Sequence, residues 1–282
     1  MLHDQLQICY PRHPLLREHI AYYYFLRTEP DFYSRYFSFP NTITSFNIHR
    51  GVKADIDRQR IAVRYNGTND HLIILQGKYE RPLEVELSGR LDKVTIGFKP
   101  LGLGHFIDQH YGKAAPHASQ VFTGWDTDAR YQELLRRYYA TNDLDQRVEL
   151  LEQFLLSRFH PVPGIELLNI ALALLGDEAQ LSISAIAGEL ELTERTFNRL
   201  FHRHMGVSPS AYRMILRFRR SMEVKLFSDR LMSLTEACYR SGFYDQAYFN
   251  KLYRKATGAT PGRFFQEVNK LAEDRLIFKV TA

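Results

Sequence analysis

The stretch Thr193-Glu-Arg-Thr-Phe-Asn-Arg-Leu-Phe-His-Arg-His-Met-Gly-Val-Ser-Pro209 recurs downstream as Asp245-Gln-Ala-Tyr-Phe-Asn-Lys-Leu-Tyr-Arg-Lys-Ala-Thr-Gly-Ala-Thr-Pro261. Matching residues stand 52 positions apart, as 249 − 197 and 258 − 206 show. A repeat in constant register marks a duplicated supersecondary unit. We therefore expect two copies of one helical unit in the C-terminal third of the chain.

Each copy predicts an amphipathic helix with defined ends. Thr193 and Asp245 are residue types that cap helix N-termini, and Gly206 and Gly258 stand where a helix C-cap needs positive φ. Between these ends, apolar residues recur at helical spacing: Phe197, Leu200, Phe201 and Met205 in the first copy, and Phe249, Leu252 and Tyr253 in the second. We expect these apolar faces to be core.

The opposite face of each repeat helix is polar or small. It carries Arg195, Asn198, Arg199 and His202 in the first copy, and Gln246, Ala247, Asn250, Lys251 and Arg254 in the second. Amide and basic side chains on a short helix are those that read base edges in the DNA major groove, where Arg favours guanine and Asn favours adenine. We interpret these nine residues as candidate DNA-binding residues.

A second, shorter helix is expected before each repeat helix, which makes each unit a helix-turn-helix. The apolar residues that predict these shorter helices are Ile183, Ile186, Ala187 and Leu190, and then Leu234, Ala237 and Cys238. Gly242 suits the left-handed turn of the second unit, but Glu191 stands at the equivalent place in the first. Because Glu in a left-handed conformation costs energy, the first turn is expected to be strained or differently shaped.

The two units are expected to be joined by one long helix over residues 209–225, with Ser208 as its N-cap and Pro209 in its first turn. Residues 181–282 hold 17 Lys and Arg against 10 Asp and Glu, a balance of +7, whereas residues 1–180 have a balance of −2. A basic C-terminal third suggests a polyanionic partner, although a soluble surface with chance charge asymmetry explains the balance equally well.

Residues 1–125 predict a β-rich region. Short segments rich in β-branched and aromatic residues, separated by turn signals, are 35–39, 43–48, 60–65, 72–75, 83–87 and 93–98. Many short strands at this spacing indicate a small barrel or sandwich. The fold class expected for the chain is α+β: a small, cupin-like N-terminal β-barrel with helices, then an all-α domain of two helix-turn-helix units joined by a long helix.

Residues 126–160 change to a helical period, with one apolar stripe around Leu134 and Leu135 and another around Val148 and Leu151. Such stripes pack on their own domain or form a dimer seam, and stripe width does not separate the two. Residues 161–164, Pro-Val-Pro-Gly, break the pattern. The expected divisions are a sensor or dimerisation domain at 1–125, a helical linker or dimerisation segment at 126–160 and a DNA-binding domain at 164–275.

The C-terminal residues resemble the AraC/XylS family of bacterial transcription regulators. The residues that carry the resemblance are Ile186-Ala187, Phe197-Asn-Arg199-Leu-Phe201 and Gly206-Val-Ser-Pro209, then Gly242-Phe243, Lys251-Leu-Tyr253 and Gly258-Ala-Thr-Pro261. The resemblance spans about residues 165–270. The sequence departs from the family pattern at Glu191, at Lys251 and at Ala237-Cys238, which affects fine specificity and not the fold.

The resemblance implies a sequence-specific transcription regulator, an activator, that binds double-stranded DNA and RNA polymerase. A weaker resemblance, from Gln76-Gly77 to Leu101-Gly102, implies a cupin-like β domain that binds a small-molecule effector or mediates homodimerisation, and it names no ligand. The N-terminus lacks a signal-peptide pattern, and no apolar run is long enough for a membrane span. We therefore expect a cytoplasmic protein that does not enter a membrane.

The alternative is a cupin-type metal-dependent enzyme fused to a helical interaction domain. It would need a convergent histidine cluster, and the β-rich region offers only scattered histidines at 49, 71, 105, 110 and 117. A DNA-repair methyltransferase would need several cysteines, and the chain has two, Cys9 and Cys238. We therefore predict no catalytic residues, no metal and no cofactor, and we expect Cys238 to be a small buried hydrophobe.

Overall fold

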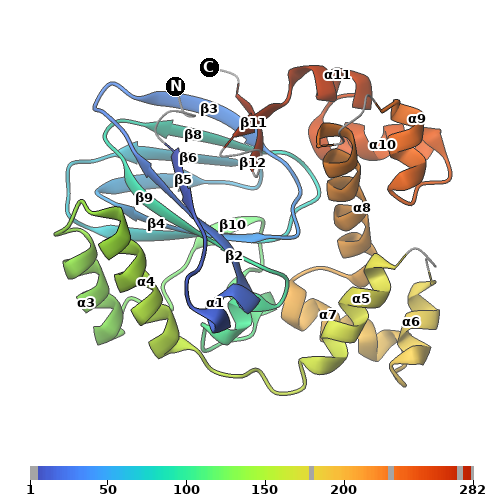
Figure 1. The fold of residues 1–282 in the computed structure, drawn as a ribbon, viewed down its shortest axis with the longest axis horizontal. Coiled ribbons are helices and arrows are strands. Elements are labelled where there is room, and N and C mark those ends of the chain that lie inside the picture. Colours follow the sequence, from blue (N-terminus) through green and yellow to red (C-terminus); the bar gives the residue numbers. More distant parts are fainter. Residues whose placement is uncertain (1–5, 178–180, 228–231, 272–275, 281–282) are drawn as a thin grey trace.

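The computed structural model describes residues 6–177, 181–227, 232–271 and 276–280. A sheet-rich N-terminal half lies beside a helical C-terminal half (Figure 1). The α+β class expected from the sequence is therefore confirmed.

The described strands form two six-stranded sheets. The first has the order β1 (Leu6–Cys9), β2 (Ile20–Arg27), β9 (Asp92–Phe98), β4 (Thr44–Arg50), β7 (His71–Gln76) and β10 (Ser119–Val121). The second has the order β11 (Asn269–Leu271), β12 (Leu276–Val280), β3 (Tyr33–Ser38), β8 (Leu83–Ser88), β6 (Arg60–Tyr65) and β5 (Val52–Ile56). Within the described ranges no hydrogen-bonded strand pair joins the two sheets, so the expected closed barrel is instead a two-sheet sandwich.

The period of two along β2 explains this layering. Tyr22, Tyr24 and Leu26 pack in one core cluster with side chains of the second sheet, such as Val85. The alternate residues of β2, such as Tyr23, point to the other face of the first sheet, where a second cluster forms. The first sheet is thus the middle layer of the N-terminal half.

Two helices cover the outer face of the first sheet: α3 (Ala129–Tyr138) and α4 (Leu144–Arg158). The residues of both apolar stripes, among them Leu134 and Leu151, are buried in the cluster formed with that sheet. They pack within their own chain, so these stripes do not form a dimer seam. Shorter helical segments, α1 (Pro14–His19), η2 (Gly102–His105) and α2 (Tyr111–Ala114), complete this half.

The aromatic residues Phe46 and Phe98 are part of this core. Both are fully buried, their ring centroids are 6.1 Å apart, and the ring of Trp125 lies 4.6 Å from that of Phe46. The aromatic rings fill the space between the first sheet and the helices that cover it.

The C-terminal half consists of α5 (Glu166–Gly176), α6 (Ile183–Glu189), α7 (Glu194–Met205), α8 (Pro209–Leu226), α9 (Leu234–Arg240), α10 (Gln246–Thr257) and α11 (Pro261–Glu267). The long helix α8 lies between the two units, with α5–α7 near one end and α9–α11 near the other (Figure 1). Ser208 caps α8 by accepting a hydrogen bond from the Ala211 backbone N–H, and Pro209 occupies its first turn, as predicted.

The last strands return to the sheet-rich half. β12 pairs antiparallel with β3, with Phe278 opposite Ser38 and Val280 opposite Tyr36, and β11 pairs with β12. Residues 269–271, which we expected in the all-α region, are therefore a strand. The physical reason is that β3 would otherwise be a sheet edge with unpaired backbone groups, which an extended segment of the same chain can satisfy.

Side chains also join the two halves. Phe39, just after β3, packs in the core of the second helical unit, with its ring centroid 5.0 Å from that of Phe264. Lys255 of α10 forms an ion pair with Glu80, in the segment between β7 and β8. The sheet-rich half is therefore packed against the second helix-turn-helix unit by both apolar and charged contacts.

Candidate nucleic-acid interface

The turns of the two units have the same hydrogen-bond pattern. The Leu192 N–H donates to the Ala187 carbonyl at 2.9 Å, and the Phe243 N–H donates to the Cys238 carbonyl at 3.2 Å. Gly242 has φ 79° and Glu191 has φ 55°, so both residues are left-handed. The first turn therefore has the same shape as the second and places a glutamate in a conformation that suits glycine.

We expect Glu191→Gly to stabilise the protein by about 0.5–1 kcal/mol, because a left-handed non-glycine residue costs about 1–2 kcal/mol and glycine returns part of this in unfolded-state entropy. Chemical denaturation monitored by circular dichroism measures the change. The control is Glu189→Gly, two residues earlier and still in the helical conformation of α6, which should destabilise by up to about 1 kcal/mol. Equal loss of stability in both variants would contradict the proposed strain.

The ends of both repeat helices form as the sequence predicts. The Thr193 hydroxyl accepts a hydrogen bond from the Thr196 N–H, and the Asp245 carboxylate accepts from the first turn of α10. Gly206 has φ 73° and Gly258 has φ 75° at the C-caps. The helix α7 begins three residues after its turn residue Glu191, whereas α10 begins four residues after Gly242. The second unit therefore has one more residue than the first before its repeat helix.

The apolar faces of α7 and α10 are core, as predicted. Phe197, Phe201 and Met205 pack with α5, α6 and α8 in one cluster, and Phe249 and Tyr253 pack in another. Cys238 is fully buried in the second cluster, and burial raises the pKa of its thiol. It is therefore the small buried residue that we expected. Each repeat helix is fixed by its own unit's core, which leaves its polar face directed outward.

The nine candidate DNA-binding residues lie on these outward faces. Eight of them are exposed, namely Arg195, Arg199, His202, Gln246, Ala247, Asn250, Lys251 and Arg254, and Asn198 is half-buried. The Asn198 Nδ2 donates to the Glu194 carbonyl at 2.9 Å, and the Gln246 Nε2 donates to the Thr235 hydroxyl at 2.6 Å. Among the described residues, the guanidinium groups of Arg195, Arg199 and Arg254 have no carboxylate partner.

Two aromatic residues near α10 were given no role by the sequence analysis. Tyr244 is 77% exposed just before the helix, and Tyr248 is 45% exposed in its first turn. The Tyr248 hydroxyl lies 3.1 Å from the Met214 sulfur of α8. The sequence does contain a signal for them, because both are aromatic residues at positions outside the apolar face of α10. These tyrosines border the polar face of α10.

The C-terminal ends of both repeat helices contact the sheet-rich half. A Cβ atom on Gly112 of α2 would lie 2.8 Å from the His202 carbonyl oxygen, so α2 packs directly against the last turns of α7. Lys251 lines a groove of about 200 Å³ together with Pro40 and Glu80. Lys251 therefore lies at the border between the polar face of α10 and the N-terminal half.

The long helix α8 directs its arginines differently from one another. Arg219 is buried at the junction of the two halves, near Tyr22 and Tyr79, and burial lowers its pKa.

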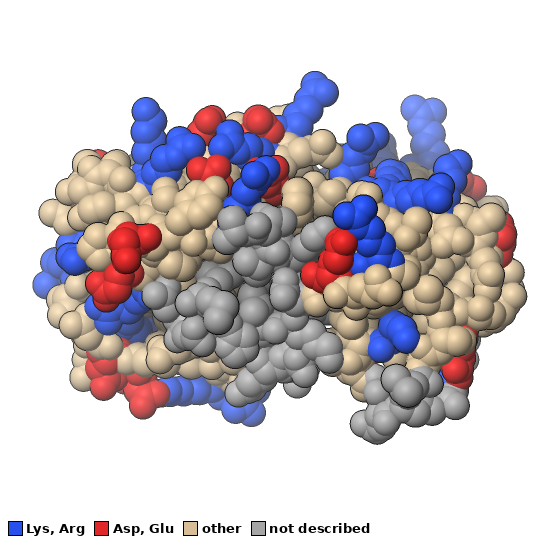
Figure 2. All heavy atoms as spheres, turned by 90° about the horizontal axis from the view of Figure 1, so that it is seen from above, with Lys and Arg blue, Asp and Glu red and all other residues tan. Residues whose placement is uncertain are grey.

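Seen from above, Lys and Arg side chains gather along one edge of the molecule over both halves, with Asp and Glu among them (Figure 2). Positive charge alone therefore does not single out one surface; the exposed faces of α7 and α10 do so by residue type and position.

Among the described residues, no group of three or more His, Cys, Asp or Glu side chains could hold a metal ion. In the same part of the chain, no helix combines the length and apolar character that crossing a bilayer requires.

Comparison with known proteins places the helical half in a family. The helix-turn-helix domain family matches residues 168–267, which run from α5 to α11. The arabinose operon regulatory protein of Salmonella typhimurium is 28% identical over 163 residues, covering 53% of this chain and 53% of that protein. The transcriptional activator RhaS of Salmonella arizonae is 34% identical over 77 residues, covering 27% of each chain. The chain thus spans about half the length of the arabinose regulator it matches.

Among solved structures, ToxT from Vibrio cholerae aligns with 93% of this chain and 98% of its own, at a TM-score of 0.48 and 12% identity. The fold and the family match define a protein with a double helix-turn-helix domain. The resemblance of the sequence to the AraC/XylS family covers nearly the same stretch, about residues 165–270, as this family match.

Proposed function

We propose that this protein is a sequence-specific DNA-binding transcription regulator. The observation that carries the proposal is the pair of capped helices, α7 and α10, whose apolar faces are locked in separate cores and whose polar faces are exposed. A helix presented in this way in a helix-turn-helix unit enters the DNA major groove. The arabinose operon regulator and the activator RhaS support the proposal because both are named as regulators.

Two units in one chain read two successive major-groove segments, about 34 Å apart on one face of the duplex. We assign Arg195, Asn198, Arg199 and His202 to one segment, and Gln246, Ala247, Asn250, Lys251 and Arg254 to the other. Because the two sets differ, the recognised site is asymmetric. On binding, the side-chain amides of Asn198 and Gln246 exchange their intramolecular hydrogen bonds for bonds to bases.

The remaining parts of the proposal concern partners and organisation. The protein acts in the cytoplasm as an activator that contacts RNA polymerase, without enzymatic activity. Residues 164–275 contain the DNA-binding unit, and residues 1–125, with the helical segment 126–160, form a cupin-like region that senses a small-molecule effector or mediates homodimerisation. The name of RhaS, a transcriptional activator, supports the sign of regulation.

Single alanine variants test the two-segment assignment. We expect Asn198→Ala and Gln246→Ala each to weaken binding by about 1–3 kcal/mol and to relax sequence preference in different halves of one site. Binding selections from a random DNA pool, sequenced for each variant of the full chain, measure the preference at every position. Gln153→Ala, an exposed change on α4, is the matched control and should leave the preference unchanged.

The selections also distinguish the ways in which the proposal could fail. Loss of preference confined to the same half for Asn198→Ala and Gln246→Ala would rule out reading by two separate helices. Uniform weakening on all sequences, with a lower salt dependence, would show phosphate contacts instead of base contacts. A folded protein that selects no sequence from the pool would overturn the proposed function itself.

A further inference from the structure

An open pocket lies at one end of the sandwich, beside the loop that joins α3 to α4. Its volume is about 830 Å³, within the range of small-molecule sites in proteins. Its walls come from the ends of β2, β4 and β6, from the turn before β9, and from the α3–α4 loop. The recognition helices α7 and α10 contribute nothing to it.

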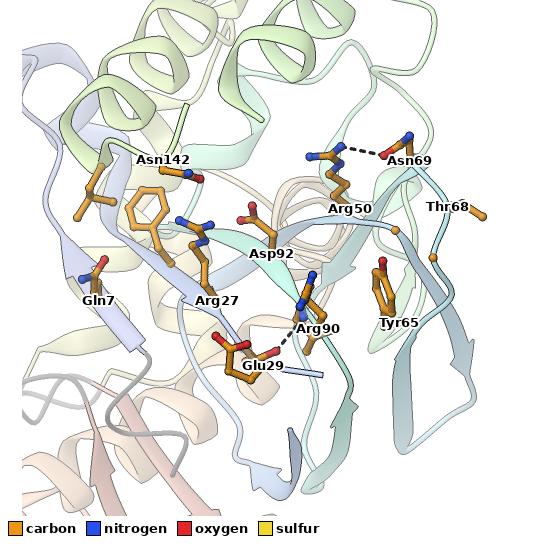
Figure 3. Close-up of a pocket in the computed structure, with 16 residues that line it drawn as sticks. Gln7, Arg27, Glu29, Arg50, Tyr65, Thr68, Asn69, Arg90, Asp92 and Asn142 are labelled. Atoms are coloured by element: carbon orange, nitrogen blue, oxygen red, sulfur yellow. Dashed lines mark hydrogen bonds between the residues drawn. The ribbon is translucent and has the colours of Figure 1, made fainter. Parts of the chain in front are cut away.

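Three arginines from three separate segments line this pocket. Arg27 ends β2, Arg50 ends β4 and Arg90 stands in the turn before β9. Figure 3 shows Arg27, Arg90 and Asp92 around the middle of the pocket, with Arg50 and Asn69 along one side. Residues far apart in the sequence thus bring guanidinium groups to one hollow.

Two acidic side chains, Glu29 and Asp92, also line the pocket, and the charge of Asp92 is neutralised by an arginine. Arg147 of α4 donates to both carboxylate oxygens of Asp92, at 2.7 and 2.9 Å, from outside the pocket lining. Within the described chain, Arg27, Arg50 and Arg90 have no carboxylate at ion-pair distance. Glu29 is the other acidic side chain in the lining. Three positive guanidinium groups therefore line the pocket with one carboxylate, that of Glu29, that does not pair with Arg147.

One of the three arginines is held in place by neutral partners. Arg50 donates to the Asn69 side-chain oxygen at 2.8 Å, and its guanidinium lies 5.3 Å from the centroid of the Tyr139 ring. These contacts fix the orientation of the group without cancelling its charge. A planar guanidinium that is oriented in advance binds a carboxylate or a phosphate through paired hydrogen bonds.

We propose that this pocket binds a small molecule that carries two or more negatively charged oxygen groups, carboxylates or phosphates. Arg27, Arg50 and Arg90 bind these groups from different sides. The side-chain amides of Asn69 and Asn142 supply both donors and acceptors for hydroxyl groups of the same molecule. The concave shape suits a small ligand and not a nucleic acid duplex, so this site is separate from the proposed DNA-binding faces.

Calorimetry and thermal unfolding of the full chain test the site without DNA. The probes are citrate and pyrophosphate at matched ionic strength, with glucose as a neutral comparison. We expect a probe at about 100 times its Kd to raise the Tm by about 5 °C. The double variant Arg27→Gln/Arg90→Gln should weaken binding at least about tenfold, because each charge-assisted pair lost costs about that much.

The matched control is Arg58→Gln/Arg137→Gln, which removes the same charge from two exposed positions outside the pocket. It should bind both probes as tightly as the wild type, and circular dichroism should show that both double variants are folded. Binding of citrate alone indicates a carboxylate ligand, and binding of pyrophosphate alone indicates a phosphate ligand. The proposal is overturned if neither probe binds, if the pocket variant binds unchanged, or if the control variant loses as much.

Discussion

Phe201→Ala should destabilise the protein by about 3–5 kcal/mol and remove most of its DNA binding. The Phe201 side chain is fully buried, with its ring centroid 5.7 Å from that of Phe197 and 5.6 Å from that of Tyr212. The substitution leaves a cavity where α7 meets α8. Since α7 depends on this contact for its position, its polar face should lose its fixed orientation. Chemical denaturation and gel-shift titration measure the two effects.

Tyr244→Ala is the matched control for this loss. It also deletes an aromatic ring from a helix-turn-helix unit, but Tyr244 is 77% exposed, so the free energy of unfolding should change by no more than about 0.5 kcal/mol. If Phe201→Ala were as stable as Tyr244→Ala, the apolar face of α7 would not be the core that positions the helix. Retained stability together with lost DNA binding would point to a direct contact of Phe201 with DNA.

Asp92→Asn should destabilise the sheet-rich half by about 3–5 kcal/mol, because it leaves a buried guanidinium without its counter-charge. The Arg147 side chain is only 3% exposed and donates to both oxygens of Asp92, which fastens α4 to β9. The pKa of Arg147 is raised, with burial opposed by the hydrogen bond to Asp92, so the group stays charged. Urea denaturation at neutral pH measures the loss.

Glu133→Gln provides the comparison for an exposed ion pair. Glu133 and Arg136 pair on the surface of α3, where their side chains are 49% and 72% exposed. Solvent screens such a pair, so its loss should change stability by no more than about 1 kcal/mol. Similar small losses in Asp92→Asn and Glu133→Gln would mean that Arg147 finds another partner or water, and that the pair does not hold α4 on the sheet.

The elements that the sequence predicted well are those set by local chemistry. Thr193, Asp245 and Ser208 cap helices through hydrogen bonds within three residues, and Gly206 and Gly258 end them through their own φ angles. Neighbours in the sequence are sufficient for such interactions. The same holds for the polar faces of α7 and α10, whose members were found from helical spacing alone. Whether those faces contact DNA remains the proposal tested above.

The elements that the sequence did not predict depend on partners far along the chain. The strand β12 forms against β3, more than two hundred residues away, and no local pattern identifies that partner. For the same reason, the short segments of residues 1–125 predicted strands but not whether the sheets would close into a barrel or stack as a sandwich. The stripes of α3 and α4 were ambiguous until the first sheet was seen to cover them.

The sequence by itself determined the duplicated unit, its caps, its left-handed turn residues and its candidate reading faces, because each follows from hydrogen bonds and spacing within one or two helical turns. Only the tertiary structure places Arg27, Arg50 and Arg90 around one pocket. They lie on different segments and form no motif: strand register sets Arg27 and Arg50 opposite Asp92, and the turn before β9 carries Arg90. Likewise, the strain of a left-handed Glu191 was readable in the sequence, but the ion pair between Lys255 and Glu80 required the folded chain.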